Sequence, residues 1–173
     1  EEIGLGDNLA MAERESVRLP MQWADRPGAG FTTAPEGRLP RTLLRDGPFG
    51  YPSLNVRSQR EDPGSFLNWT ERAIRTRKEW PELGWGEWQV LGARNPSVLA
   101  HVATWDGSSV LAVHNFAATT ARASVRLPKD ATGGEWRHIF GPLGADAPAV
   151  DGDRLSCELP PYGYHWFGRK EGV

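Results

Sequence analysis

The sequence predicts a mainly β protein with an α part, in which a loop and one or two helices precede an antiparallel β-sandwich. Two observations carry this prediction. Short apolar runs separated by turn dipeptides follow one another after Gly86, and a helical period occurs before Pro81 and not after it. We therefore expect two domains, residues 1–86 and residues 87–173.

The stretch from Val17 to Phe31 is expected to be an irregular loop, because Pro20 and Pro27 each remove a backbone donor. Irregular loops that carry polar and aromatic side chains are where binding residues tend to lie. The alternative is a loop held in place by burial of Met21 and Trp23. The candidate binding residues of this loop are Arg18, Gln22 and Asp25.

One long helix is predicted from Asp62 to Trp80. Asp62 suits the N-cap, Pro63 suits the first helical position, and Pro81 ends the helix. A short helical turn is possible over Leu9–Ser16, and residues 32–51 are expected to form a long loop. The apolar period of the long helix predicts one buried stripe, formed by Phe66, Leu67, Thr70, Ala73, Ile74 and Arg77.

Seven short strands are expected after Gly86. Asp106-Gly107 between two apolar runs predicts a hairpin. Residues 98–103 and 110–113 are apolar on both faces, so their strands should be central, and Pro160-Pro161 should precede the last strand. The expected strands are Trp88–Leu91, Val98–Trp105, Ser109–Phe116, Ala121–Leu127, Glu135–Phe140, Arg154–Leu159 and Tyr164–Gly168.

Composition narrows the classes of partner and compartment. The net charge of −2 gives no electrostatic reason to expect nucleic acid or an anionic membrane as a partner. No apolar run approaches the ~18 residues of a membrane span, and no signal peptide is recognised. A single cysteine, Cys157, favours a reducing compartment, so we expect a cytoplasmic protein. The chain opens on Glu1, which suggests a piece of something longer.

The sequence carries no complete active site. Its four histidines lack the spacing of a metal site, so no metal and no cofactor are expected. No phosphate-binding loop, nucleophile elbow or Cys–His arrangement occurs. Glu1 and Glu2 are paired carboxylates at the very end of the chain. Eight tryptophans suit a β-rich core, and they also suit the stacking of sugar faces on aromatic rings.

Three blocks combine unusual residue types in a fixed order: EEIGLGDN at residues 1–8, ESVRLPMQW at 15–23 and SFLNW at 65–69. In these blocks the chain resembles the α-amylase superfamily of glycoside hydrolases. Trehalose synthases are the most similar group, and oligo-1,6-glucosidases come next. The resemblance covers the whole chain, more weakly beyond Gly86. Leu19 departs from it, because a threonine is usual at that position.

The resemblance implies that residues 1–86 are the end of a (β/α)8 barrel and that residues 87–173 are the β-sandwich that follows it. It also implies that the catalytic carboxylates come earlier than this chain, so no catalytic residue is expected in it. A retaining glycosidase needs two carboxylates about 5–5.5 Å apart. The implied partners are the preceding barrel portion of the same protein and an α-linked gluco-disaccharide or short oligosaccharide.

Arg18 is the residue that the resemblance assigns to the pocket entrance, where a guanidinium can bind two sugar hydroxyls. The alternative for Arg18 is an ion pair with a carboxylate of the barrel rim. Isomerisation, transglycosylation and hydrolysis all stay open, because water access decides among them.

A second hypothesis is a non-catalytic carbohydrate-binding or structural module, and a third is an interaction module with no sugar role. Exposed tryptophans aligned on one sheet face would favour carbohydrate binding.

Overall fold

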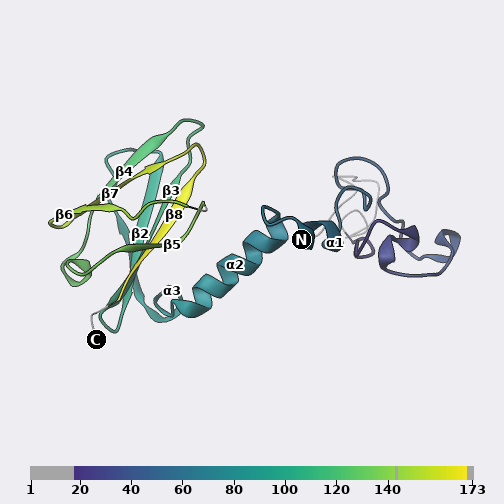
Figure 1. The fold of residues 1–173 in the computed structure, drawn as a ribbon, viewed down its shortest axis with the longest axis horizontal. Helices are drawn as coiled ribbons and strands as arrows, with labels where there is room; N and C mark the ends of the chain where they lie inside the picture. The colour runs from purple at the N-terminus through teal and green to yellow at the C-terminus, as the bar shows by residue number, and fades with distance from the viewer. Residues whose placement is uncertain (1–17, 143, 171–173) are drawn as a thin grey trace. The chain divides into compact units, whose positions relative to one another are not determined.

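The computed structural model describes residues 18–142 and 144–170 (Figure 1). They belong to two compact units, one ending at Arg72 and one beginning at Ala73. The helical turn expected over Leu9–Ser16 lies outside the described residues. The assignment of residues 1–86 and 87–173 to two domains of a longer enzyme stays a prediction.

The first unit is mostly loop. It contains two 3-10 turns, η1 (Pro27–Gly30) and η2 (Glu36–Arg38), a short helix α1 (Val56–Glu61), and the start of α2 (Phe66–Glu79). Residues 32–51 form the expected long loop, interrupted by η2 alone. A small apolar cluster of Ala29, Leu43 and Tyr51 lies beneath it.

Helix α1 was not predicted, and a capping box explains why it forms. The Asn55 side chain accepts a hydrogen bond from the backbone N–H of Ser58 at 3.0 Å, and the Ser58 hydroxyl lies 3.4 Å from the backbone N of Asn55. This reciprocal pair satisfies donors that a helix start otherwise leaves unpaired. The six-residue helix is too short to show an apolar period, so no hydrophobic pattern indicated it.

The predicted start of the long helix is wrong by three residues. Asp62 accepts a hydrogen bond from Gly64 N–H at 2.8 Å and so forms a turn, not a helix cap. Ser65 has the capping role instead, because its hydroxyl oxygen accepts from Asn68 N–H at 3.2 Å. Helix α2 therefore begins at Phe66, and it ends at Glu79, one residue before the predicted end at Trp80.

The buried stripe predicted on this helix is also wrong. In α2 the only buried residue is Thr76, and the Phe66 and Ile74 side chains are more than half exposed. An apolar stripe becomes buried only when another element packs on it. No described element covers this one fully.

The second unit is a two-sheet sandwich, as the turn-separated runs predicted. One sheet has the order β1-β2-β3-β8-β5 and the other β4-β7-β6, and every pairing is antiparallel. A short helix, α3 (Glu82–Trp85), precedes the strands, and the turn η3 (Lys129–Ala131) follows β4. The strands are β1 (Glu87–Leu91), β2 (Val98–Trp105), β3 (Ser108–Asn115), β4 (Ala121–Arg126), β5 (Arg137–Phe140), β6 (Ala149–Asp151), β7 (Arg154–Leu159) and β8 (Tyr164–Arg169).

The core lies between the two sheets. Strand β3 sits in the middle of the five-stranded sheet and is buried on both faces, so the prediction of a central strand there is confirmed. Strand β6 was not predicted, because its three residues are all exposed and show no alternation. The largest fully buried side chains include Leu111, Val113 and Phe167 from one sheet and Val125, Leu155 and Leu159 from the other.

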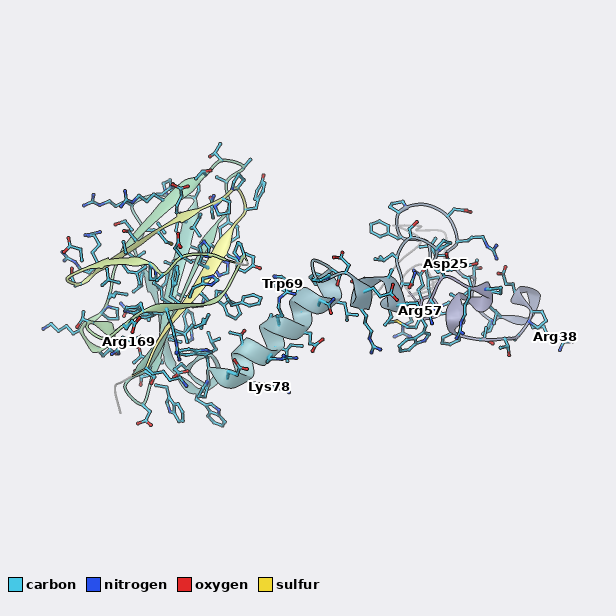
Figure 2. The ribbon with its side chains drawn as sticks, in the orientation of Figure 1. Asp25, Arg38, Arg57, Trp69, Lys78 and Arg169 are labelled. Atoms are coloured by element: carbon cyan, nitrogen blue, oxygen red, sulfur yellow. The ribbon has the colours of Figure 1, made fainter. Side chains whose placement is uncertain are left out.

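Two local features fix how the strands connect. Asp106 and Gly107 have φ angles of 50° and 72°, the left-handed pair that a two-residue hairpin between β2 and β3 requires. At the end of β8, Arg169, labelled in Figure 2, donates from Nη2 to the carbonyls of Gly107 at 2.9 Å and Asp130 at 2.8 Å.

Among the described helices, none has the length and apolar character needed to cross a bilayer.

Candidate functional site

The candidate binding loop, described from Arg18 to Phe31, turns tightly around Ala29. The Ala29 carbonyl accepts hydrogen bonds from Trp23 N–H at 2.9 Å and Ala24 N–H at 3.1 Å. Ala29 is completely buried, and its positive φ of 52° is flanked by positive φ at Gly28 and Gly30. An alanine in this region is strained, and surrounding hydrogen bonds must hold it there.

Gln22 ties the loop to the segment that leads into α1. Its side chain is 4% exposed, and Nε2 donates to the carbonyls of Phe49 at 3.0 Å and Leu54 at 2.5 Å. Its backbone carbonyl accepts from Val56 N–H at 2.9 Å. Both amide hydrogens are therefore used inside the protein, whereas Oε1 is buried and has no partner among the described residues.

Burial of Met21 and Trp23, the alternative way to hold this loop, is not what the structure shows. Met21 is 49% exposed and Trp23 is 47% exposed. Successive side chains here alternate between the two sides of an extended segment, and the amide of Gln22 and the methyl of Ala24 take the inner side. Hydrogen bonds from Gln22 anchor the loop where aromatic burial was expected.

The three candidate binding residues do not share one surface. Arg18 and Asp25 are exposed, and Asp25 stands on the loop labelled in Figure 2. Gln22 points inward. Contact of any of the three with a substrate stays a prediction.

Gln22 does line a groove of about 310 Å³ in the first unit, a size within the range of small-molecule sites. Two polar atoms of this groove, Gln22 Oε1 and Thr70 Oγ1, are buried without a partner in the described part of the chain. The groove could therefore offer hydrogen-bond acceptors to a group placed in it. Its lining is Met21, Gln22, Leu54, Asn55, Val56, Gln59, Phe66, Leu67 and Thr70.

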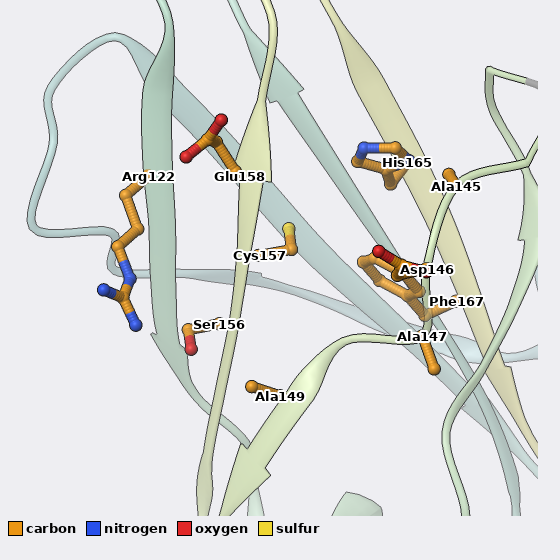
Figure 3. A pocket seen from close by; sticks show the side chains of 10 residues that line it. All are labelled: Arg122, Ala145, Asp146, Ala147, Ala149, Ser156, Cys157, Glu158, His165 and Phe167. Carbon is orange, nitrogen blue, oxygen red and sulfur yellow. The ribbon is translucent and has the colours of Figure 1, made fainter.

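A second hollow, of about 400 Å³, lies in the sandwich unit (Figure 3). Cys157 lines it from β7, and burial raises the pKa of its thiol to about 11. A thiol with that pKa stays protonated near neutral pH and is a poor nucleophile. Arg122 and Glu158 are register partners on β4 and β7 at the rim.

His165 lines the same hollow, and its Nδ1 lies 3.2 Å from Nε2 of His138. Burial lowers the pKa of both imidazoles, so the pair favours its neutral form. Across residues 18–142 and 144–170, no three metal-ligating side chains cluster. These groups provide packing and hydrogen bonding, and they show no nucleophile–base arrangement.

A third hollow, of about 450 Å³, lies between α3 and the outer face of β1 and β2. Of its polar members, Glu82 was not singled out from the sequence, and His101 was considered only as one of the four histidines that lack metal-site spacing. Trp88 was named only as the start of a strand. The sequence feature that could have indicated this hollow was the high tryptophan content of the chain. Trp88 pairs with Ala103, two residues before Trp105, so both tryptophans lie on this face, and both are exposed, by 71% and 45%. Aligned exposed tryptophans were the feature expected of a carbohydrate-binding module.

Residues 88–166 match the family described as maltogenic amylase, C-terminal domain, over a range that runs from β1 into β8. The match covers most of the sandwich unit, whose antiparallel sheets are therefore similar to that domain. The predicted resemblance to α-amylase-family enzymes is confirmed.

Relatives extend the match to nearly the whole chain. A trehalose synthase/amylase of Mycobacterium tuberculosis is 36% identical over 96% of this chain and 28% of its own length. An oligo-1,6-glucosidase of Bacillus cereus is 29% identical over 68% of this chain and 19% of its own length. This order, trehalose synthase before oligo-1,6-glucosidase, is the predicted one.

A solved structure is similar to this chain over nearly the same range. The trehalulose synthase of Pseudomonas mesoacidophila MX-45 superposes with a TM-score of 0.66 at 29% identity, covering 94% of this chain and 27% of that one. The chain therefore spans less than a third of the length of the enzymes it matches. Together with the match of residues 88–166, this makes the chain similar to the C-terminal part of a trehalose synthase-like or α-glucosidase-like enzyme.

Proposed function

We propose that this chain is the C-terminal part of an enzyme that acts on α-glucosidic disaccharides or short oligosaccharides with retention at the anomeric carbon. The observation that carries the proposal is the match to a trehalose synthase/amylase over 96% of the chain. Solved structures of the trehalulose synthase contain glucose, sucrose and isomaltulose, so a structural neighbour handles sugars of this size.

In this proposal residues 1–86 complete a (β/α)8 barrel whose preceding portion supplies the nucleophile and the acid/base carboxylate. The exposed stripe of α2 supports it, because half-exposed Phe66 and Ile74 need a covering layer to become buried. The unpartnered Oε1 of buried Gln22 supports it as well, because a group from that portion could donate to it. We expect the enzyme to be cytoplasmic.

Arg18 is proposed to bind hydroxyls of the sugar beyond the cleaved bond. It is exposed, and it lies two residues before Pro20 in a segment fixed by Gln22. Its fork of donors fits two hydroxyls of one ring. Asp25 and Gln22 remain proposed binding residues, Asp25 from the exposed side of the loop and Gln22 through Oε1.

The test compares the complete enzyme with its Arg18→Ala variant on maltose or trehalose and on an aryl α-glucoside. One lost charged hydrogen bond is worth about 1.5–3 kcal/mol, so kcat/KM for the disaccharide should fall roughly 10- to 100-fold. The aryl glucoside, which has no sugar hydroxyls in its leaving group, should lose much less. Arg18→Lys should restore only part of the activity.

Two results would count against the proposal. Equal losses on both substrates with a lower Tm would make Arg18 a member of a structural ion pair. No turnover of any α-glucoside by the complete wild-type enzyme would refute the proposed function itself.

A further inference from the structure

The groove beside α3 combines apolar walls, an exposed tryptophan and a buried acceptor without a partner among the described residues. One wall is the outer face of β1 and β2, where Val90 and Leu99 supply apolar surface. The other wall is the α3 segment, including Leu83. Small-molecule sites are concave and mostly apolar with a few well-placed polar groups, and the groove's volume of about 450 Å³ falls in their range.

Glu82 is a buried polar group of this groove with one carboxyl oxygen that has no partner among the described residues. Its side chain lines the groove and is only 3% exposed, yet its Oε2 has no hydrogen-bond partner among the described residues. A buried acceptor without a partner destabilises the fold, because it has lost its hydrogen bonds to water. A carboxylate oxygen accepts hydrogen bonds, so whatever satisfies Oε2 must bring a donor such as a hydroxyl.

Trp88 supplies the complementary surface. Its indole ring lines the same groove and is 71% exposed, which is a high value for the largest apolar side chain. The electron-rich face of an aromatic ring attracts the partial positive charge of C–H groups. The apolar face of a hexose presents such C–H groups, and its rim carries hydroxyl donors.

His101 adds a third contact on β2. Burial lowers the pKa of its imidazole, so the ring is neutral at pH 7 and offers one donor and one acceptor. It is stacked on His114, with 6.2 Å between the ring centroids, and this contact helps to hold its orientation. A neutral polar group with both hydrogen-bonding roles suits a hydroxyl.

We propose that the groove formed by Glu82, Trp88 and His101 is a saccharide-binding site of the sandwich unit. The sugar face stacks on Trp88, and a hydroxyl donates to Glu82 Oε2. An α-glucan chain is the ligand class, because its glucose units repeat both features and because the enzyme proposed above acts on α-linked glucosides. The choice of the α linkage therefore rests on the proposed function, whereas binding of a saccharide to the groove is measured without any catalytic turnover.

The experiment titrates the 173-residue chain with maltoheptaose and with maltose by isothermal calorimetry, using cellohexaose as the β-linked comparison. We expect saturable binding of maltoheptaose and weaker binding of cellohexaose. Trp88→Ala should weaken binding about tenfold or more, as expected for loss of an aromatic contact. Glu82→Gln should weaken it about tenfold, because the amide offers one acceptor oxygen where the carboxyl group offers two.

Trp85→Ala is the matched control, because Trp85 is an exposed tryptophan of the sandwich unit that does not line the groove. It should bind as the wild type does. Trp88 is exposed, so its replacement should leave the fold intact. If Glu82→Gln unfolds, the binding of maltoheptaose by Trp88→Ala alone tests the proposal. No saturable binding, or binding that Trp88→Ala leaves unchanged, would overturn the proposal. Binding of tetramethylammonium without binding of maltoheptaose would also overturn it, since that would make the groove a cation site.

Discussion

At the scale of single residues, the buried amide of Gln22 decides the shape of the candidate loop. Its two donors satisfy two backbone carbonyls that are 27 and 32 positions away in sequence, and its own carbonyl pairs with the start of α1. A buried hydrogen bond contributes about 0.5–1.5 kcal/mol, and leaving an acceptor unsatisfied costs more than that. The loop is held by the polar side chain of Gln22, so burial of Met21 and Trp23, the alternative considered from the sequence, does not describe it.

Gln22→Ala should therefore loosen the loop and the residues it holds. We expect faster hydrogen exchange at the amides of Val56 and Arg57, which donate to the carbonyls of residues 22 and 23. Met21→Ala, a change at the exposed neighbour, should alter this exchange little. Unchanged protection in Gln22→Ala would show that Gln22 does not anchor the loop.

The histidines make the stability of the sandwich depend on pH. Burial lowers the pKa of His101, His114, His138 and His165 in the folded state. The unfolded chain therefore takes up protons at a higher pH, near the ordinary histidine value of about 6.5. The stabilisation is fully present above that value and is lost as the pH falls below it.

We expect the Tm of the chain to fall between about pH 7.5 and about pH 5.5. His165→Asn should make this fall smaller, because one of the paired imidazoles is removed. Thermal unfolding followed by circular dichroism measures both effects. A Tm that is constant or rises toward pH 5.5 would contradict this explanation.

At the scale of elements, β8 depends on a close approach that only glycine allows. The Trp80 ring is 5% exposed and lies against Gly168, where an added Cβ would come within 2.2 Å of a ring carbon. Arg137 and Lys170 flank the ring, at 5.5 and 4.9 Å from its centroid. The segment before α3 is thereby fastened to the sheet.

Gly168→Ala should destabilise the sandwich by about 1–3 kcal/mol through overpacking. Gly92→Ala is the matched control, since nothing lies within 4 Å of its added Cβ, and it should stay within about 0.5 kcal/mol of the wild type. Urea unfolding measures both variants. In the Gly168→Ala background, Trp80→Leu should regain part of the loss, and two glycine variants of equal stability would disprove the contact.

Elements that carry a strong local signal were predictable, and others were not. The Asp106-Gly107 pair predicted its hairpin, and the apolar runs predicted both central strands, because these signals depend on neighbours in sequence. Helix α1 and strand β6 are too short to show a period. The start of α2 depended on whether Asp62 or Ser65 met the free N–H groups, a choice made by Gly64 and its turn.

The candidate sites, too, were only partly predictable from the sequence. The loop that carries Arg18 and Asp25 was predictable from its prolines and its residue types. The inward role of Gln22 was not, because its partners at Phe49 and Leu54 are set by the fold. The groove at Trp88 was not predictable either, since it needs α3, β1 and β2 to be assembled first.

At the scale of the whole molecule, we expect the sandwich to be the part most resistant to proteolysis. Its core joins buried side chains from both sheets, whereas the first unit has a small apolar cluster and long irregular segments. Limited proteolysis should therefore leave a resistant core that starts between roughly Asp62 and Glu87, because nicking concentrates in exposed and weakly packed segments. A resistant core lying mainly before Pro81 would refute this.

We propose that this chain belongs to an α-glucoside-acting enzyme whose catalytic carboxylates come from the preceding portion of the protein. The most direct measurement is an assay of the rigorously purified 173-residue chain on maltose, trehalose and an aryl α-glucoside. We predict no turnover, because the resemblance implies that the paired carboxylates that protonate the leaving oxygen and form the glycosyl-enzyme come earlier than this chain. Turnover that Glu2→Gln abolishes would contradict the claim.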